Sequence, residues 1–280
     1  MTMMDTDRVW LITGASAGFG RDLVLAALAA GDRVMATARR PRQLDDLITI
    51  GRGRVRTAPL DVTDNAQIAA AVAQTIVEFG RIDVLVNNAG HGSVGAVEEL
   101  DLADLRALMD VMFFGAVAVT KAALPHMRAQ RGGAIIQLSS MGGQLSMPGF
   151  GAYCSAKFAL EGLSEALAAG VAPFGIRVLI VEPGAFRTEF GGHRMHRSPI
   201  IEEYAVSTGS TRAAVDAMDG TQPGDPTKAA RAILEVIDSA DPPLRLALGN
   251  DAVDLIAAHH ELLRTDLARW EKLSRSTDLD

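Results

Sequence analysis

Short apolar runs alternate with longer amphipathic stretches along most of the chain. The apolar runs end at turn-forming residues, as buried strands do. They predict strands at residues 9–13, 33–37, 55–58, 82–86, 134–138, 177–181 and 244–248. The amphipathic stretches predict helices at residues 18–30, 65–79, 102–128, 151–171, 227–237 and 251–270.

The order of these elements predicts the fold class. A strand followed by a helix, repeated along the chain, indicates βαβ units with right-handed crossovers. Such units build a parallel sheet that is covered on both faces. We therefore expect an α/β protein with a Rossmann-type, doubly wound parallel sheet of about seven strands and helices on both faces. No linker divides the chain, so residues 1–280 are predicted to form a single domain.

The alternation stops between Phe186 and Gly224, where no period is visible and glycines are frequent. A stretch of this length inside a compact domain is usually a lid or a binding loop. We expect a substrate lid at residues 187–225. A disordered insert is the alternative, against which its Phe, Met, Ile and Tyr side chains argue. Asp225 and Pro226 then provide an N-cap and a first helical residue.

Charge and composition exclude several classes of protein. The 280 residues carry 27 lysines and arginines against 34 aspartates and glutamates, a net charge of −7, without a basic run. Nucleic acid is therefore not an expected partner. The only cysteine, Cys154, cannot form an internal disulfide, which fits a cytoplasmic location. Residues 1–8 lack the plan of a signal peptide, and the uncharged stretch 132–156 is too rich in Gly, Ser and Pro to span a membrane. No membrane association is expected.

The sequence shows neither a set of metal ligands nor the motif of a nucleophilic serine. His193 and His196 lie in the irregular segment without a third ligand, and His259 and His260 suggest an exposed pair on a helix. No Gly-x-Ser-x-Gly elbow occurs. No metal is expected.

A glycine-rich turn links the first strand to the first helix. Residues 13–20 read Thr-Gly-Ala-Ser-Ala-Gly-Phe-Gly. Such a turn lets backbone N–H groups and the positive end of a helix approach a pyrophosphate. A mere tight turn is the alternative, because the spacing differs from the usual Gly-x-Gly-x-x-Gly. The predicted cofactor contacts here are Gly14, Ser16, Gly18, Phe19 and Gly20.

The end of the second strand indicates which dinucleotide binds. NAD sites usually place an acid there, whereas NADP sites place arginine against the 2′-phosphate. This chain has Arg39 and Arg40 and no acid, so NADP(H) is favoured over NAD(H). Solvated surface charges are the alternative.

The next two strand ends carry further candidates. Asp61 and Val62 follow the third strand, where the carboxylate can meet an adenine amino group or serve as an N-cap or turn residue. Asn88, Ala89 and Gly90 follow the fourth strand, where small residues keep the sheet edge open to a ligand. Turn chemistry explains asparagines there equally well.

Tyr153 and Lys157 lie one helical turn apart on one face of a predicted helix. Tyrosine has an ordinary pKa near 10, and a nearby ammonium group lowers it. Such a tyrosine can exchange a proton with a carbinol oxygen. Ser139 and Ser140 end the preceding strand, where a hydroxyl can hold the same oxygen. The alternatives are an exposed helix face and structural serines.

Together these motifs resemble the short-chain dehydrogenase/reductase family, in its non-extended branch, over about residues 8–188. They stand in family order: residues 13–20, Asp61, residues 87–90, Ser140, Tyr153 with Lys157, and residues 183–188. The spacing of thirteen residues to Tyr153 selects Ser140 over Ser139. Residues 36–40 and 113–125 are most similar to the branch with retinol and 17β-hydroxysteroid dehydrogenases and bacterial carbonyl reductases.

The resemblance implies roles for these residues. Tyr153 would be the general acid/base, Ser140 would position the carbonyl, and Lys157 would lower the tyrosine pKa and bind the nicotinamide ribose. Thr188 would meet the nicotinamide carboxamide, and Asp61 the adenine. The implied cofactor contacts also include Asn88, Pro183, Gly184 and Phe186. The family usually forms homodimers or homotetramers, so we expect one of these.

One position departs from the family pattern. Met112 stands where the family often has an asparagine, whose main-chain carbonyl helps hold a water in a proton relay to the lysine. Methionine keeps the carbonyl and loses the amide side chain. Plain core packing of Met112 is the alternative.

Apolar side chains flank the predicted catalytic residues and suggest a hydrophobic substrate pocket. They are Met141, Leu145, Met147, Phe150, Phe190 and Met195. We therefore expect an NADP(H)-dependent oxidoreductase acting on a bulky hydrophobic ketone or aldehyde and its alcohol. Packing of the lid is the other explanation for these residues. A catalytically weak NADP(H)-binding sensor and a sugar-nucleotide epimerase or dehydratase are the alternative functions, the latter opposed by the short chain and the apolar lid.

Overall fold

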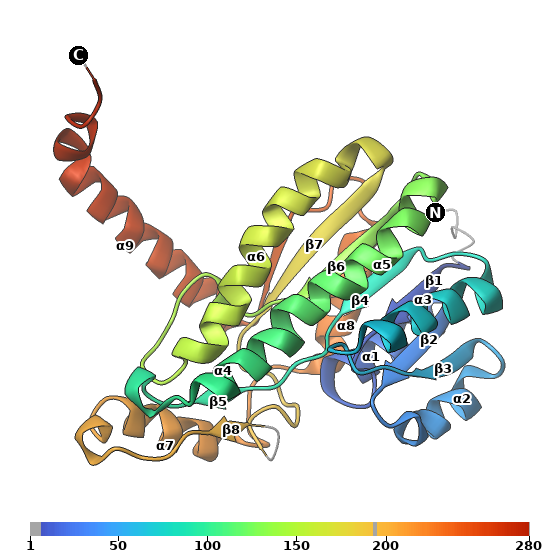
Figure 1. Cartoon of the computed structure of the whole chain (residues 1–280), viewed down its shortest axis with the longest axis horizontal. Coiled ribbons are helices and arrows are strands. Elements are labelled where there is room, and N and C mark those ends of the chain that lie inside the picture. The colour runs from blue at the N-terminus through green and yellow to red at the C-terminus, as the bar shows by residue number, and fades with distance from the viewer. Residues whose placement is uncertain (1–6, 193–194, 280) are drawn as a thin grey trace.

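The computed structural model describes residues 7–192 and 195–279, so the predictions for residues 1–6 and for His193 lie outside it. Seven strands of the described chain form one sheet in which every neighbouring pair is parallel (Figure 1). Their order is β3 (Val55–Pro59), β2 (Arg33–Ala38), β1 (Val9–Ile12), β4 (Val84–Asn87), β6 (Gly133–Leu138), β7 (Ile176–Pro183) and β9 (Arg245–Leu248). The predicted Rossmann-type sheet is confirmed.

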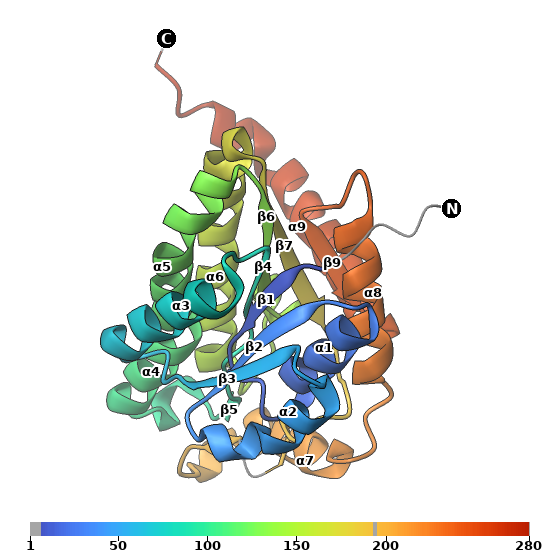
Figure 2. The ribbon, with the colours of Figure 1, turned by 90° about the vertical axis from the view of Figure 1, so that its right-hand side faces the viewer.

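Helices cover both faces of this sheet (Figure 2). One face carries α1 (Gly18–Ala29) and α8 (Pro226–Asp238), which contact each other. The other carries α3 (Asn65–Phe79), α5 (Gly115–Gln130) and α6 (Gly151–Val171). The remaining α-helices of the described residues are α2 (Asp45–Gly51), α4 (Leu102–Met109), α7 (Thr208–Met218) and α9 (Asn250–Arg275).

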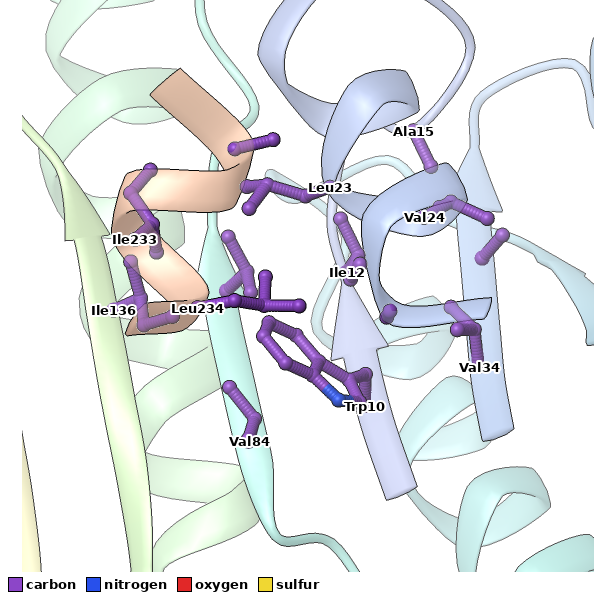
Figure 3. Close-up of a cluster of buried hydrophobic side chains, with 14 of the residues drawn as sticks. Trp10, Ile12, Ala15, Leu23, Val24, Val34, Val84, Ile136, Ile233 and Leu234 are labelled. Atoms are coloured by element: carbon purple, nitrogen blue, oxygen red, sulfur yellow. The ribbon is translucent and has the colours of Figure 1, made fainter. Parts of the chain in front are cut away.

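The alternation of side chains along β1 builds two apolar layers. Trp10 and Ile12 pack toward α1 and α8, where Leu23 and Ile233 meet them (Figure 3). Leu11 points to the opposite layer, beneath α3 and α5. All five side chains are fully buried. Burial on both faces explains why the strands are almost continuously apolar.

The strand order reverses between β1 and β4, since β2 and β3 lie on one side and the later strands on the other. In open parallel sheets, ligands bind in the crevice at the carboxyl ends of the strands beside such a reversal. The glycine-rich turn and the turn after β4 both leave the sheet at this crevice.

The region between Phe186 and Gly224 is more regular than predicted. It contains β8 (His196–Arg197), which pairs in parallel with β5 (Ser93–Val94), and it contains α7. The interpretation of this region as irregular is therefore wrong. Helix α7 buries only Thr208 and Val215 and has no side-chain N-cap, so its sequence lacks the usual helical signals.

The predicted helix at residues 102–128 is interrupted. A π-helical turn at Asp110–Phe114 separates α4 from α5. Among the described residues, the stretch Leu102–Gln130 is the one helix long and apolar enough to cross a membrane by length and composition. Val119, Ala123 and Met127 are buried in the core layer beneath the sheet, which accounts for much of this apolar character.

Glu99 connects the segment that contains α7 to the rest of the protein through hydrogen bonds and an ion pair. Its buried carboxylate accepts hydrogen bonds from Ala96 N at 2.6 Å and Ile201 N at 2.9 Å, and pairs with Arg212 of α7 at 2.7 Å. Burial alone would raise the pKa of Glu99, but these partners bring it below its ordinary value. The segment predicted to be a lid is thus held in place by an ion pair whose carboxylate is buried.

Candidate active site

The glycine-rich turn presents an uncapped helix end to the crevice. Helix α1 begins after Ala17 without a side-chain cap and without an acid in its first turn. Gly14 and Gly18 have φ angles of +66° and +54°, which residues other than glycine rarely adopt. The first N–H groups of a helix need a partner, and an anion supplies one. These features fit the pyrophosphate of a dinucleotide.

Asn88 holds this turn in shape. Its Nδ2 donates to Thr13 O at 2.9 Å and to Gly14 O at 3.0 Å. Thr13 Oγ1 in turn accepts from the backbone N–H of Asn88 at 2.9 Å and of Ala89 at 3.1 Å. Gly90 follows, with the Met112 side chain against it. The side chain of Asn88 therefore shapes the backbone of the cofactor turn.

Arg39 and Arg40 follow β2 directly and are exposed. Within residues 7–192 and 195–279, neither guanidinium forms an ion pair. Two free positive charges at this strand end fit a 2′-phosphate, and they also fit solvated surface charges.

Asp61 follows β3 and stabilises its own turn. Its Oδ1 accepts from Thr63 N at 3.0 Å and from Thr63 Oγ1 at 2.8 Å. The N-cap of α3 is Asp64, so the alternative of Asp61 as that cap is wrong. Val62 is buried beside Gly115. The turn holds the Asp61 carboxylate near the edge where the adenine is expected.

The segment after β7 lies against the glycine-rich turn. Gly184 N donates to Leu248 O at 2.9 Å, and Ala185 N donates to Asp251 Oδ2 at 2.6 Å. The Phe186 ring packs on Phe19 with centroids 5.1 Å apart. A cavity of about 450 Å³ opens beside this contact, with Gly18 and Thr188 in its lining. Pro183 and the rest of this motif thus lie close to the predicted pyrophosphate site.

Ser140, Tyr153 and Lys157 lie together at the end of β6 and the start of α6. Ser140 lies just after β6, where its Oγ accepts from Gly142 N at 3.0 Å and donates to Pro183 O at 3.3 Å, with the Tyr153 hydroxyl nearby. Tyr153 is buried in the first turn of α6. Lys157 Nζ donates to Leu138 O at 2.6 Å and lies 5.8 Å from the Tyr153 ring centroid. The structure therefore brings the three predicted catalytic residues together.

Burial dominates the electrostatics of these groups. It raises the pKa of Tyr153 above its ordinary value, against a smaller lowering by the neighbouring Ser140 hydroxyl. Burial also lowers the pKa of Lys157 to about 8, against the charge of Glu161. The lowering of the tyrosine pKa by Lys157 that we expected does not prevail in the protein alone. Tyr153 is instead held as a neutral phenol, the form that can donate a proton.

Cys154, next to Tyr153, is buried, and burial raises the pKa of its thiol. A thiol of this kind is a poor nucleophile at neutral pH. Among the described residues, no group of three or more His, Cys, Asp or Glu side chains could hold a metal ion. His193 lies outside the described residues.

A pair of buried carboxyl groups behind Ser140 was not predicted from the sequence. Ser139 Oγ donates to Glu161 Oε1 at 2.5 Å, and Gln144 Nε2 donates to Glu182 Oε1 at 2.7 Å. Arg245 of β9 lies 3.2 Å from Glu161 Oε2 and 3.1 Å from Glu182 Oε1. Residues on both sides of the Ser140 turn are thus tied to the pair. The available signal was weak: Glu182 is the one acid in the apolar strand β7, whereas Glu161 shares its helix with Lys157 and Glu165.

Two buried carboxylates share one arginine here, so the second negative charge is costly. Burial, followed by the charge of Glu161, raises the pKa of Glu182 to about 7. The pair therefore retains a proton below neutral pH.

This arrangement predicts how stability depends on pH. The folded pKa of Glu182 exceeds its unfolded value, so its ionisation destabilises the folded state, a cost that is complete above about pH 7. Between pH 6 and 8.5, we expect the Tm of Glu182→Gln to fall by roughly 3–5 °C less than that of the wild type. Thermal unfolding measured by circular dichroism tests this. Glu165→Gln, which removes an exposed partner of Arg245, is the control and should keep the wild-type slope. Parallel curves for wild type and Glu182→Gln would contradict the prediction.

Met112 lies in the π-helical turn and is buried. A cavity of about 10 Å³, room for one water molecule, lies between it and Lys157. Asn87 also lines this cavity, and its buried Oδ1 has no hydrogen-bond partner among the described residues. Buried polar atoms of this kind are usually satisfied by water. The structure therefore keeps a polar, water-sized space beside Lys157 in spite of the methionine.

The six predicted substrate-pocket residues divide into two groups. Phe150 and Phe190 have ring centroids 6.3 Å and 5.3 Å from that of Tyr153, and Met195 packs against both phenylalanines in one apolar cluster. The other three pack against Ala252 and Ile256 of α9 and are Met141, Leu145 and Met147. The first group borders the reacting tyrosine, and the second shapes the loop after Ser140.

Comparison with known proteins identifies the family. The model of the short chain dehydrogenase family matches residues 8–198. This chain is a short-chain dehydrogenase. It is 42% identical over 268 residues to oxidoreductase BOA17 of Botryotinia fuckeliana, covering 95% of this chain and 98% of that protein. It is 35% identical to retinol dehydrogenase 8 of Bos taurus, covering 91% and 86% of the two chains.

A crystal structure of a short-chain dehydrogenase from Streptomyces avermitilis has the same fold as this short-chain dehydrogenase. It superposes with a TM-score of 0.92 at 51% identity, covering 97% of this chain and all of that one. The sequence relationship and the shared fold make this protein an oxidoreductase of the family.

Proposed function

We propose that this short-chain dehydrogenase uses NADP(H) to interconvert a bulky hydrophobic ketone or aldehyde and its alcohol. The observation that carries the proposal is the cluster of Ser140, Lys157 and a buried Tyr153 near the uncapped end of α1. This arrangement supports an acid and a carbonyl-binding hydroxyl acting next to a dinucleotide.

The residues of the chain have distinct parts in this reaction. A bound nicotinamide dinucleotide would be held by residues 14–20 and by Thr188, and it supplies the hydride. Ser140 Oγ hydrogen-bonds the carbonyl oxygen of the substrate, and Tyr153 donates a proton to that oxygen. Burial supports the reductive direction, since it keeps the phenol protonated until it is used.

Reprotonation of Tyr153 requires a path from solvent. Lys157 has three donors, of which one is bonded to Leu138 O. The cavity lined by Lys157, Met112 and Asn87 has room for one water molecule, with which the lysine could exchange a proton. The catalytically weak sensor is therefore the less favoured function, because the site keeps both its acid and this space.

The preference for NADP(H) rests on Arg39 and Arg40. Replacing both with alanine should weaken NADPH binding by roughly 10- to 100-fold, the value of a charge-assisted phosphate contact, and leave NADH binding nearly unchanged. Fluorescence titration with both cofactors measures the effect. Arg42→Ala, which removes a third exposed arginine nearby, is the matched control. An equal loss for NADPH and NADH would contradict the assignment.

The proposed substrate class rests on the apolar rings around Tyr153 and on the name of the relative retinol dehydrogenase 8. A panel of aryl, alicyclic and long-chain ketones and aldehydes, assayed by consumption of NADPH, tests it. The proposal expects kcat/KM to rise with the apolar area of the substrate. Turnover of small polar ketones alone would contradict the substrate class while leaving the reaction type intact.

A further inference from the structure

Helix α9 begins on the body of the protein and then leaves it (Figure 1). The helix runs over Asn250–Arg275, and only Ala252 and Ile256 near its start are buried. These two pack against the loop after Ser140. The rest of the helix projects from the body without an apolar partner among the described residues.

Beyond His260, which hydrogen-bonds Gln144 of the body, the projecting part carries an apolar face. Leu263, Leu267 and Trp270 follow Ile256 at helical spacing and are 52%, 69% and 54% exposed. Leu262 and Leu273 border them and are also exposed. Apolar side chains of this size rarely gather on a free surface unless another surface covers them. The first turns of α9 are therefore packed on the body, whereas the apolar face further along the helix is exposed to solvent.

We propose that this face binds the same face of α9 in a second copy of the chain, with the two helices antiparallel. The axis of twofold symmetry would pass close to Leu267. Leu263 of one copy would then lie near Trp270 of the other. This contact is independent of the reaction proposed above.

The charges beside the apolar face support this partner and this direction. In the repeat set by Ile256, Leu263, Leu267 and Trp270, the residues Arg264 and Glu271 occupy the same flanking position, called e in coiled coils. An antiparallel pair brings e against e, so each Arg264 meets the Glu271 of the other copy. The axis between these two residues falls at Leu267, which is the centre of the apolar face.

A parallel pair would have the opposite effect. It brings the other flanking position, g, against e of the partner helix. Asp266 occupies g, so it would face Glu271 of the other copy, and two carboxylates would repel each other twice in each pair. The sequence of α9 therefore favours the antiparallel arrangement.

The charges also favour protein over a lipid surface. Helices that lie on membranes are rich in lysine and arginine. Helix α9 has nearly equal numbers of both signs, and the whole chain has a net charge of −7. The basic residues of α9 are Arg264, Arg269, Lys272 and Arg275, and the acidic ones are Asp251, Asp254, Glu261, Asp266 and Glu271. Anionic lipid gains little from this pattern.

The first test measures the mass of the assembly by size-exclusion chromatography with light scattering. Leu267→Asp should halve the mass, whether the wild type is a dimer or a tetramer, because it places two carboxylates at the axis. Thr265→Asp adds the same charge on the opposite side of the helix and should keep the wild-type mass. A monomeric wild type, or an unchanged mass for Leu267→Asp, would overturn the proposal.

The second test exchanges the two flanking charges. Arg264→Glu alone and Glu271→Arg alone should each shift the assembly toward the smaller species at least 10-fold in dissociation constant. The double variant should restore it. Within one helix, Arg264 pairs with Glu261 and Glu271 with Arg275, and the double variant leaves both of these mismatched. Restoration therefore reports the contact between copies, and a double variant weaker than both single ones would overturn it.

The third test fixes the geometry. Leu267→Cys should form a disulfide-linked dimer under mild oxidation, since the two copies of this position lie at the axis. The native Cys154 is buried and does not compete. A failure to cross-link would reject the antiparallel pair. Binding of the wild type to anionic phospholipid vesicles that Leu267→Asp abolishes, without any change in mass, would assign the face to a membrane and overturn the proposal.

Discussion

Replacing Tyr153 with phenylalanine is expected to reduce kcat by roughly 10²- to 10⁴-fold, the range of general acid–base catalysis. The substitution removes only the hydroxyl, which lies beside Ser140. The ring keeps its contacts with Phe150 and Phe190, whose centroids lie 6.3 Å and 5.3 Å away. The pocket and the fold should therefore persist, and the loss reports proton transfer.

Two measurements separate this result from a general failure of the protein. The Kd for NADPH should stay within about threefold of the wild type, and the Tm should not fall. Tyr204→Phe is the matched control, because the other tyrosine of the chain is only half-buried and donates its hydroxyl to Glu98 at 2.8 Å. It should keep wild-type kcat. A Tyr153→Phe variant with more than a tenth of wild-type activity would show that another group supplies the proton.

The second large effect is expected from Gly20→Ala. A Cβ at this position would overlap Asn88 Nδ2 and Gly14 O. Neither atom can move away from the added methyl group freely, since Asn88 is hydrogen-bonded to the backbone of the glycine-rich turn. Overpacking of this kind costs about 1–3 kcal/mol, and it displaces the N–H groups that face the cofactor. We expect NADPH binding to weaken at least 100-fold and the Tm to fall by several degrees.

Gly162→Ala in α6 is the control for the extra methyl group. A Cβ there meets no atom within 4 Å. Alanine stabilises an exposed helical position by about 0.5–1 kcal/mol over glycine, so this variant should be slightly more stable and bind NADPH normally. Isothermal titration and thermal unfolding measure both quantities. Normal cofactor binding by Gly20→Ala would show that the turn is not the pyrophosphate site.

The sequence predicts the sheet and the catalytic cluster for the same reason. The carboxyl ends of parallel strands meet at one edge, so motifs that follow β1, β4, β6 and β7 converge once the strands are recognised. Tyr153 and Lys157 need one further step, because their helix follows β6. This explains why residues far apart in the chain could be placed together from their order alone.

Other features depend on tertiary packing and leave little trace in the sequence. Nothing in the sequence pairs Glu161 with Glu182, and only β9 brings Arg245 between them. Helix α7 is held by the Arg212–Glu99 pair rather than by an apolar stripe. The pKa of Tyr153 follows the amount of burial, which spacing to Lys157 does not reveal.

The contacts of Arg245 and Asp251 also govern when the site can form during synthesis. Ser140, Tyr153 and Lys157 leave the ribosome about a hundred residues before these two do. Until then the two buried glutamates have no cation, and the backbone of Ala185 lacks its acceptor. A nascent chain therefore carries every reacting group well before it carries a finished site. Activity should appear only after nearly the whole chain has emerged, in one late step of folding.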